Sequence, residues 1–192
     1  EAANRVLLAA HWDTRPFADK DANDPKKPID GANDGASGVG VLLEIARTIH
    51  TSQQKPEIGV DMIFFDGEDY GQPDDSEFAY QDDTWCLGSQ YWSKNKHNPG
   101  YRANYGILLD MVGAEGAKFA REGTSMQYAK EIVDKVWKAG NSLGYSDYFK
   151  YVNAPAITDD HSYVNAWGNI RMIDIIEYNM NNPDDYFGPY HH

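Results

Sequence analysis

Four short apolar runs recur along the chain, and each has the length and the β-branched or aromatic content of a buried strand. They cover residues 5–10, 58–65, 105–109 and 172–176. The first run is almost wholly apolar, which is typical of strands covered on both faces. Helical patterns lie between these runs, so the sequence predicts an α/β protein.

The longest helical patterns follow the first and third strands. Residues 39–49 repeat apolar side chains at helical spacing, which predicts a helix with one face in the core. A capping-box pattern at Thr124–Gln127 precedes a second apolar stripe, which ends near Gly140 or Gly144. A shorter helix is predicted to begin at Cys86.

Two polar stretches, 15–33 and 71–84, show neither the strand period nor the helix period. The first is rich in Pro, Asp and Lys and is predicted to be an irregular loop. The second carries several Asp residues and is predicted to be a mobile lid or a surface loop.

Acidic and histidine residues stand where the predicted strands end. His11 and Asp13 follow the first strand, Glu68 and Asp69 the second, and Asp110 the third. The ligand crevice of an open α/β sheet lies at the carboxyl ends of its strands. These side chains therefore converge if the strands are parallel neighbours.

The adjacent acids Glu68 and Asp69 suggest metal chemistry. Like charges at close range raise one pKa or require a cation between them. One carboxylate could then bind the metal while the other moves a proton. The alternative from the residues alone is a solvated acidic turn. Asp34 precedes a predicted helix. It could be the N-cap of that helix. Alternatively it belongs to a binding site, because the small residues on both sides let the backbone and a ligand approach its carboxylate closely.

Composition narrows the class of protein. The 192 residues, 41% of them hydrophobic, suffice for one substantial core, so we expect one domain. A net charge of −13 argues against a nucleic-acid partner or an anionic membrane surface. The single cysteine, Cys86, leaves oxygen and imidazole groups as metal ligands. No apolar run approaches twenty residues, so no membrane span is predicted.

Seven blocks give the chain a family resemblance: AHWDT, GANDGASGVGVLLEIAR, IFFDGEDYG, LGSQYW, ILLDMVGA, ITDDHSYV and FGPYHH. In sequence and spacing they resemble the zinc-dependent exopeptidase superfamily, which contains the bacterial double-zinc aminopeptidases and the glutaminyl cyclases. The resemblance implies an α/β/α sandwich with a mixed, mostly parallel central sheet. It also implies one catalytic domain over residues 1–192. Helices that precede the first strand and follow the final histidine in the family are absent from this sequence, which we interpret as a fragment or an incompletely represented chain.

The resemblance also implies roles for individual residues. The zinc ligands fall on Asp34, Asp69 and His192, and the general acid/base on Glu68. Aminopeptidases of the family hold a second zinc with the positions of His11 and Asp110, with Asp34 as the bridge.

One position favours a cyclase over an aminopeptidase. Aminopeptidases usually carry Ser where this chain has Asp159, whereas glutaminyl cyclases carry Asp. In the cyclases one zinc is bound, and the strand-end Asp, here Asp110, pairs with that extra Asp. The chain departs from the animal cyclases at Asp69, which replaces Glu, and at His191, which replaces a pocket Trp.

The expected reaction converts an N-terminal glutaminyl residue of a peptide into pyroglutamate with loss of ammonia. Glu68, Asp110 and Asp159 would be catalytic, with one zinc ion bound. Candidate walls of the substrate pocket are Trp12, Trp85, Trp167 and His191. Two alternatives stay open, a di-zinc aminopeptidase and a non-catalytic peptide-binding domain. Relatives are usually exported, so the resemblance implies a periplasmic or extracellular location.

Overall fold

The four apolar runs of the sequence form one parallel sheet. The computed structural model describes residues 4–73, 76–188 and 191. The sheet has the strand order β2-β1-β3-β6, and every neighbouring pair is parallel. Its strands are β1 (Arg5–His11), β2 (Gly59–Phe65), β3 (Tyr105–Asp110) and β6 (Met172–Ile176).

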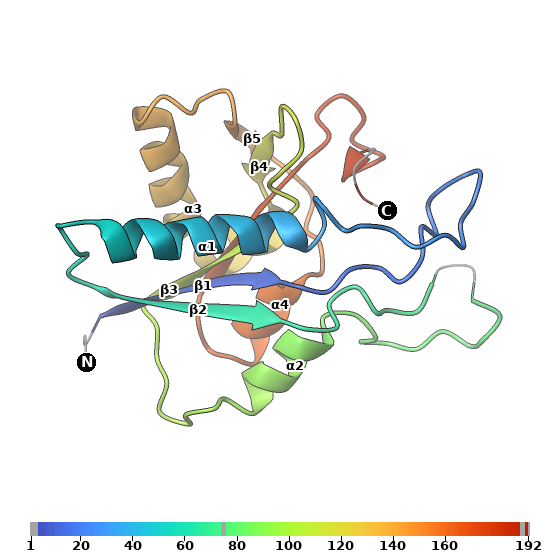
Figure 1. The fold of residues 1–192 in the computed structure, drawn as a ribbon, viewed down its shortest axis with the longest axis horizontal. Coiled ribbons are helices and arrows are strands. Elements are labelled where there is room, and N and C mark those ends of the chain that lie inside the picture. Colours follow the sequence, from blue (N-terminus) through green and yellow to red (C-terminus); the bar gives the residue numbers. More distant parts are fainter. Residues whose placement is uncertain (1–3, 74–75, 189–190, 192) are drawn as a thin grey trace.

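Helices cover both faces of this sheet (Figure 1). On one face lie α1 (Ala36–Thr51) and α3 (Gly123–Ser142), and on the other lie α2 (Leu87–Lys94) and α4 (Asp160–Ala166). Successive residues of a strand point to opposite faces. Leu109 therefore belongs to the core under α1 and α3, while Leu108 belongs to the core under α2 and α4. The predicted α/β/α sandwich with a mostly parallel sheet is confirmed.

The first helix approaches the sheet through a glycine. A Cβ atom on Gly38 would collide with the carbonyl oxygen of Leu109 and would lie 2.9 Å from the Cβ of Ala10. Gly40, on the exposed side of the same helix, has no atom within 4 Å of such a position. The small residue at position 38 therefore allows α1 to lie directly on β1 and β3.

The predicted capping box of α3 is wrong. The helix begins at Gly123, and its N-cap is Glu122, whose side chain accepts the backbone N–H groups of Thr124 and Ser125. The Glu122 carboxylate thus satisfies the N–H of Thr124, which the side chain of Gln127 was expected to satisfy. The sequence pattern also missed three short elements: β4 (Phe119–Arg121), β5 (Phe149–Asn153) and α4. The first two form a separate parallel pair.

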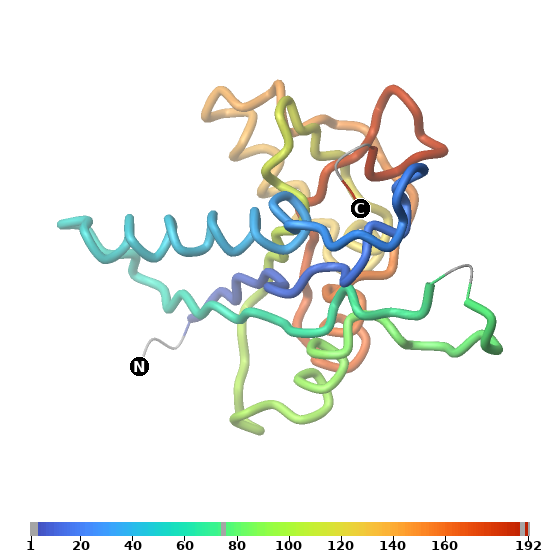
Figure 2. Tube along the Cα trace, turned by 45° about the vertical axis from the view of Figure 1, so that its right-hand side comes forward, coloured from blue at the N-terminus to red at the C-terminus, as the bar shows by residue number. Residues whose placement is uncertain are grey.

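Loops gather at the carboxyl ends of the strands. The loops that follow β1 and β2 project beyond the sheet there (Figure 1). The C-terminal segment returns to the same end, close to the loop that precedes α1 (Figure 2). No helix in the described part of the chain has both the length and the apolar character needed to cross a bilayer.

Candidate metal centre

A cavity of about 440 Å³ opens at the carboxyl ends of the strands. Its lining includes the acids Asp34, Glu68, Asp69, Asp110 and Asp159. These residues come from four separate segments of the sequence. Glu68, Asp69 and Asp110 were predicted to converge at the strand ends, and Asp34 and Asp159 join them from the loops before α1 and α4. The remaining lining residues are Lys20, Tyr80, Asp82, Asp83, Trp85, Met111, Ile157, Thr158, Tyr163, Ile176, Phe187 and His191.

His11 lies between two of the carboxylates. Its Nε2 atom is 3.0 Å from Asp34 Oδ1 and 3.0 Å from Asp110 Oδ1. All three side chains are buried. Burial opposes a charge on His11, but the hydrogen bond and the charge of Asp110 outweigh it and raise the pKa of the imidazole. One ligand atom from each of the three residues lies within 4.8 Å of the others, close enough to hold a metal ion.

Asp34 is not the N-cap of α1. The cap position is Gly35, with a φ of 90°, and it makes no side-chain capping bond. A side chain at Gly35 would collide with the carbonyl oxygen of Asp13. Glycine is therefore required where the chain passes the first strand end, and Asp34 is left facing His11. Burial, followed by the negative charge of Asp110, raises the pKa of Asp34 to about 7.

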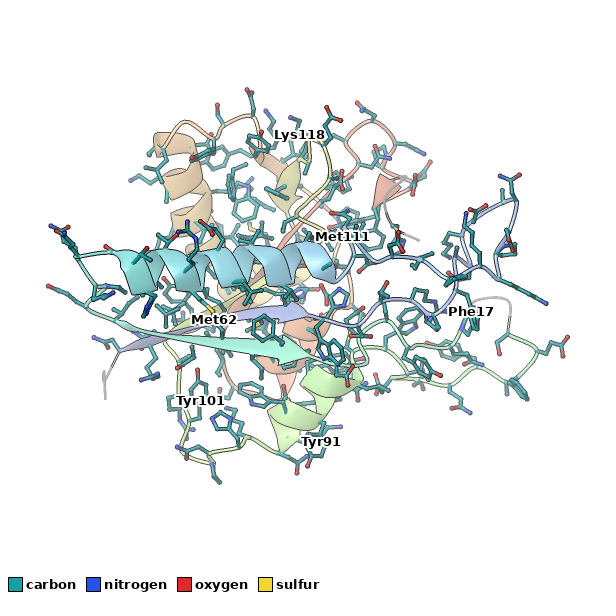
Figure 3. The ribbon with its side chains drawn as sticks, in the orientation of Figure 1. Phe17, Met62, Tyr91, Tyr101, Met111 and Lys118 are labelled. Atoms are coloured by element: carbon teal, nitrogen blue, oxygen red, sulfur yellow. The ribbon has the colours of Figure 1, made fainter. Side chains whose placement is uncertain are left out.

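Side-chain hydrogen bonds tie the loop of Asp34 to the loop after β3. Asn33 Oδ1 accepts the backbone N–H of Gly113 at 2.9 Å, and Ser37 Oγ accepts that of Val112 at 3.0 Å. Figure 3 places Met111 beside the first turn of α1. The loop that carries Asp34 is thus fixed to the loop that directly follows Asp110, the last residue of β3.

The loop of Glu68 and Asp69 is held by the first strand end. Asp13 accepts the backbone N–H of Glu68 with Oδ1 and that of Asp69 with Oδ2, both at 3.1 Å. Arg15 donates to the carbonyl oxygens of Asp69 and Gly71, both at 2.8 Å. In the His-x-Asp pattern, His11 therefore faces Asp34 and Asp110, whereas Asp13 holds the neighbouring acidic loop.

Glu68 has an unexpected partner in Cys86. The thiol donates to Glu68 Oε1 at 3.1 Å. Cys86 is the N-cap of α2 and has a left-handed backbone with a φ of 55°. Burial raises the pKa of Glu68 well above its ordinary value, and the negative charges of Asp159 and Asp69 add to this effect. Sequence reasoning used Cys86 as a helix start and to limit the metal ligands to oxygen and imidazole groups, and nothing in a single cysteine indicates a contact with a carboxylate.

Asp159 occupies the N-cap of α4 and lines the cavity with Asp110. Its side chain accepts the backbone N–H of Asp160. Burial, followed by the charge of Asp110, raises the pKa of Asp159 to about 6. The predicted hydrogen bond between Asp110 and Asp159 stays a prediction.

The predicted aromatic walls are only partly supported. Trp85 and His191 line the cavity, and His191 Nε2 lies 3.7 Å from Asp34 Oδ2. Trp12 lies outside that lining, with 60% of its surface exposed beyond the end of β1. Trp167 also lies outside, because it packs against Tyr163 at the end of α4. The predicted ligand His192 lies outside the described residues.

Sequence reasoning gave no role to a buried polar cluster behind Asp159. His161 Nε2 is 3.0 Å from Glu122 Oε2, and His161 Nδ1 is 3.9 Å from Asp174 Oδ2. None of the three side chains is exposed to solvent. Asp160 and His161 belong to a motif noted in the sequence, but Glu122 and Asp174 follow no pattern that points to it.

The chemistry of the donor set fits a divalent metal. Asp34 and Asp69 are 4% and 2% exposed, and both line the cavity with Asp110. Buried carboxylates at such density must be neutralised by protons or by a cation. Carboxylate oxygen and imidazole nitrogen are ligands that zinc accepts.

Fold and site together define an α/β/α protein with an acidic, histidine-containing centre at the carboxyl edge of a parallel sheet. Residues 1–192 match the model of Peptidase family M28, and the chain belongs to this family.

Three solved structures illustrate the relationship. A Zn-dependent exopeptidase from Parabacteroides distasonis is 52% identical, with a TM-score of 0.92 over 99% of this chain and 64% of that chain. A Bacteroides thetaiotaomicron glutaminyl cyclase bound to N-acetylhistamine is 52% identical, with a TM-score of 0.92 over 98% of this chain and 64% of that chain. A leucine aminopeptidase precursor from Bacteroides thetaiotaomicron is 49% identical, with a TM-score of 0.89 over 96% of this chain and 68% of that chain. The chain thus spans 64% of the length of the first two.

Proposed function

We propose that this chain carries the catalytic domain of a zinc-dependent glutaminyl-peptide cyclotransferase. The substrate is a peptide with a free N-terminal glutamine, and the products are the pyroglutamyl peptide and ammonia. The observation that carries the proposal is the cavity position of Asp159 beside Asp110, where family aminopeptidases usually have Ser. The 52% identity to a glutaminyl cyclase supports the same assignment.

The residues that would hold zinc are Asp34, Asp69 and His192. Two of them are buried carboxylates on the cavity wall, and His191 Nε2 already lies 3.7 Å from Asp34. Zinc in such a three-ligand site supplies Lewis acidity, which polarises a carbonyl group and stabilises the oxyanion formed from it.

Glu68 is the proposed proton carrier. The substrate α-amine forms a bond to its own γ-carbonyl carbon, and the bond from that carbon to the amide nitrogen breaks. Glu68 removes a proton from the amine and delivers a proton to the leaving nitrogen, which departs as ammonia. Glu68 is half-buried, and the loss of solvent around its carboxylate raises its pKa, which suits both transfers.

Asp110 and Asp159 would share one proton and hold the amide nitrogen of the substrate. Both face the cavity, and the charge of Asp110 contributes to a pKa of about 6 at Asp159. Two neighbouring carboxylates that share a proton can accept a hydrogen bond and donate one. Trp85 and His191 would form the walls around the glutamine side chain. We also propose a periplasmic or extracellular location, because relatives in the family are usually exported.

A di-zinc aminopeptidase is the second candidate. The observation that favours it is the cluster of His11, Asp34 and Asp110, whose ligand atoms lie within 4.8 Å of one another. In that case His11 and Asp110 would bind a second zinc, and a water molecule would be the nucleophile.

Metal content and product release separate these candidates. The full-length protein is purified without added metal, and zinc per chain is measured by mass spectrometry. It is then assayed for ammonia release from a Gln-initiated dipeptide and for hydrolysis of leucyl anilide. One zinc with ammonia release is the expected result. Two zincs with anilide hydrolysis would move the assignment to an aminopeptidase, and loss of both activities without bound zinc would favour a peptide-binding domain.

A further inference from the structure

Glu122 is the hub of a buried hydrogen-bond network behind the cavity. Its Oε1 accepts the backbone N–H of Thr124 at 2.6 Å and that of Ile157 at 3.0 Å. Its Oε2 accepts the backbone N–H of Ser125 at 2.6 Å and the hydroxyl of Ser125 at 2.7 Å. The same oxygen lies 3.0 Å from His161 Nε2. The side chain has no solvent exposure. A carboxylate surrounded by donors in this way is fixed in place.

Two of these bonds bracket the residue that faces the substrate cavity. Ile157 precedes Asp159 by two residues, and His161 follows it by two. Glu122 holds Ile157 with one oxygen and His161 with the other. Thr124 Oγ1 also donates to the carbonyl oxygen of Ile157 at 2.9 Å. The residues at the N-terminus of α3 therefore form hydrogen bonds on both sides of the turn that carries Asp159.

The network also determines which ring nitrogen of His161 carries a hydrogen. Every other group around Glu122 donates to it. Burial raises the pKa of Glu122, but the hydrogen bonds from His161 and Ser125 outweigh burial and lower this pKa to about 2. An ionised carboxylate only accepts, so His161 Nε2 carries a hydrogen. The other ring nitrogen, Nδ1, then points towards Asp174, 3.9 Å away on β6.

We propose that Glu122 and His161 are positioning residues that hold Asp159 in its orientation towards the substrate. This inference rests on the proposed cyclase function for its effect on turnover. Neither residue lines the cavity, so both act through Asp159 and not on the substrate.

Only a carboxylate fits the position of Glu122. In a Glu122→Gln variant the amide group would direct its N–H bonds at the donors of Thr124 and Ile157, or at those of Ser125 and His161. Either orientation leaves two or more buried donors without an acceptor. The variant keeps nearly the same volume, so it tests charge and hydrogen bonding rather than packing.

The test is a double-mutant cycle in the full-length, zinc-loaded enzyme. Glu122→Gln, Asp159→Asn and the double variant are compared by kcat and KM for a Gln-initiated dipeptide. We expect Glu122→Gln to lower kcat by about 10- to 100-fold with zinc content unchanged. In the Asp159→Asn background the same substitution should lower kcat little further, because the carboxylate that Glu122 positions is already gone. Additive losses in the double variant would overturn the proposal.

A second pair of variants covers the case in which Glu122→Gln does not fold. His161→Gln keeps a side-chain N–H that can reach Glu122, whereas His161→Phe removes it. The proposal requires His161→Gln to retain at least several-fold more kcat than His161→Phe, and equal values would contradict it. Asn141→Ala is the matched control, because Asn141 ties the far end of α3 to the carbonyl oxygen of Phe149 on β5. We expect it to lower thermal stability and leave kcat unchanged.

A readout without activity separates this inference from the proposed function. The His161 Nε2 hydrogen should give a low-field, slowly exchanging imidazole signal in proton NMR, and Glu122→Gln should abolish it. A wild-type protein that shows this signal but releases no ammonia would refute the cyclase function alone. A wild-type protein that releases ammonia without the signal would refute the positioning role.

Discussion

At the residue scale, Glu68 and Asp34 line the same cavity but have different partners. Asp34 faces the imidazole of His11, whereas Glu68 is held by its loop and by the thiol of Cys86. This difference in partners agrees with the proposed roles, in which Asp34 binds zinc and Glu68 moves protons.

Substitution of the two acids should separate these roles. We expect Glu68→Gln to retain zinc but to lower kcat by about 10²- to 10⁴-fold, because an amide cannot carry the proton. Asp34→Ala should lose zinc as well as activity. Zinc content and ammonia release are measured side by side, with Glu44→Gln on the exposed face of α1 as a control. Near-normal turnover in Glu68→Gln would refute its role as the base.

The thiol of Cys86 provides a second prediction at this scale. Burial raises its pKa well above the ordinary value, and the side chain has no exposed surface. Thiolate is the reactive form, so the native protein should leave Cys86 unmodified by iodoacetamide at pH 8. Peptide mass spectrometry should find Cys86 alkylated only after denaturation. Rapid alkylation of the folded protein would show that the contact with Glu68 is open to solvent.

At the scale of secondary structure elements, α1 depends on its contact with the sheet at Gly38. Gly38→Ala should destabilise the protein by about 1–3 kcal/mol, because the added methyl group collides with Leu109 and Ala10. Gly40→Ala, two residues on, meets no atom and should stabilise the helix by roughly 0.5–1 kcal/mol. Denaturant unfolding of both variants measures the difference. Equal free energies of unfolding would show that α1 does not lie directly on the strands.

The elements that the sequence predicts are those with an apolar period. The four strands and α1 carry apolar patterns with the strand or helix period, so their positions follow from the residues alone. α4 has no such pattern, because its buried face includes Asp160 and His161. β4 is a strand of only three residues.

The candidate site was predictable where it depends on strand ends. His11 and Asp110 meet because their strands are parallel neighbours, a consequence of topology that the sequence suggests. The cap of α3 was not predictable, because Glu122 is fixed by Ile157 and His161, which are distant in sequence.

At the scale of the whole molecule, the metal centre couples stability to pH. The pKa of Asp34 in the folded, metal-free protein is about 7, above its ordinary value of 3.8. The folded state therefore favours protonated Asp34, and this contribution to stability is lost as pH rises from about 4 through 7. Zinc bound to Asp34, as proposed above, would replace the proton and remove this loss.

Removal of zinc should therefore lower the stability of the folded protein by a larger amount at higher pH. Zinc at a hundredfold excess over its Kd adds about 2.7 kcal/mol, which corresponds to roughly 5–10 °C in Tm for a chain of this size. The difference in Tm between zinc-loaded and chelated protein should widen from pH 5 to pH 8. Thermal scans at both pH values, with zinc added back as the control, measure it. A difference that narrows with pH would contradict a zinc site that includes Asp34.

The strand order also governs how the chain acquires its shape during synthesis. β1 is synthesised before β2, β3 and β6, yet it lies inside the sheet, between β2 and β3. Its partners follow only after a helical crossover or a long excursion, so the first strand must wait unpaired while much of the chain is made. Of these four strands β6 is made last, after the segment that carries Asp159. A stalled or truncated chain would therefore expose an apolar, unpaired strand and would lack a complete cavity, which makes such products substrates for chaperones and proteases rather than partly active enzymes.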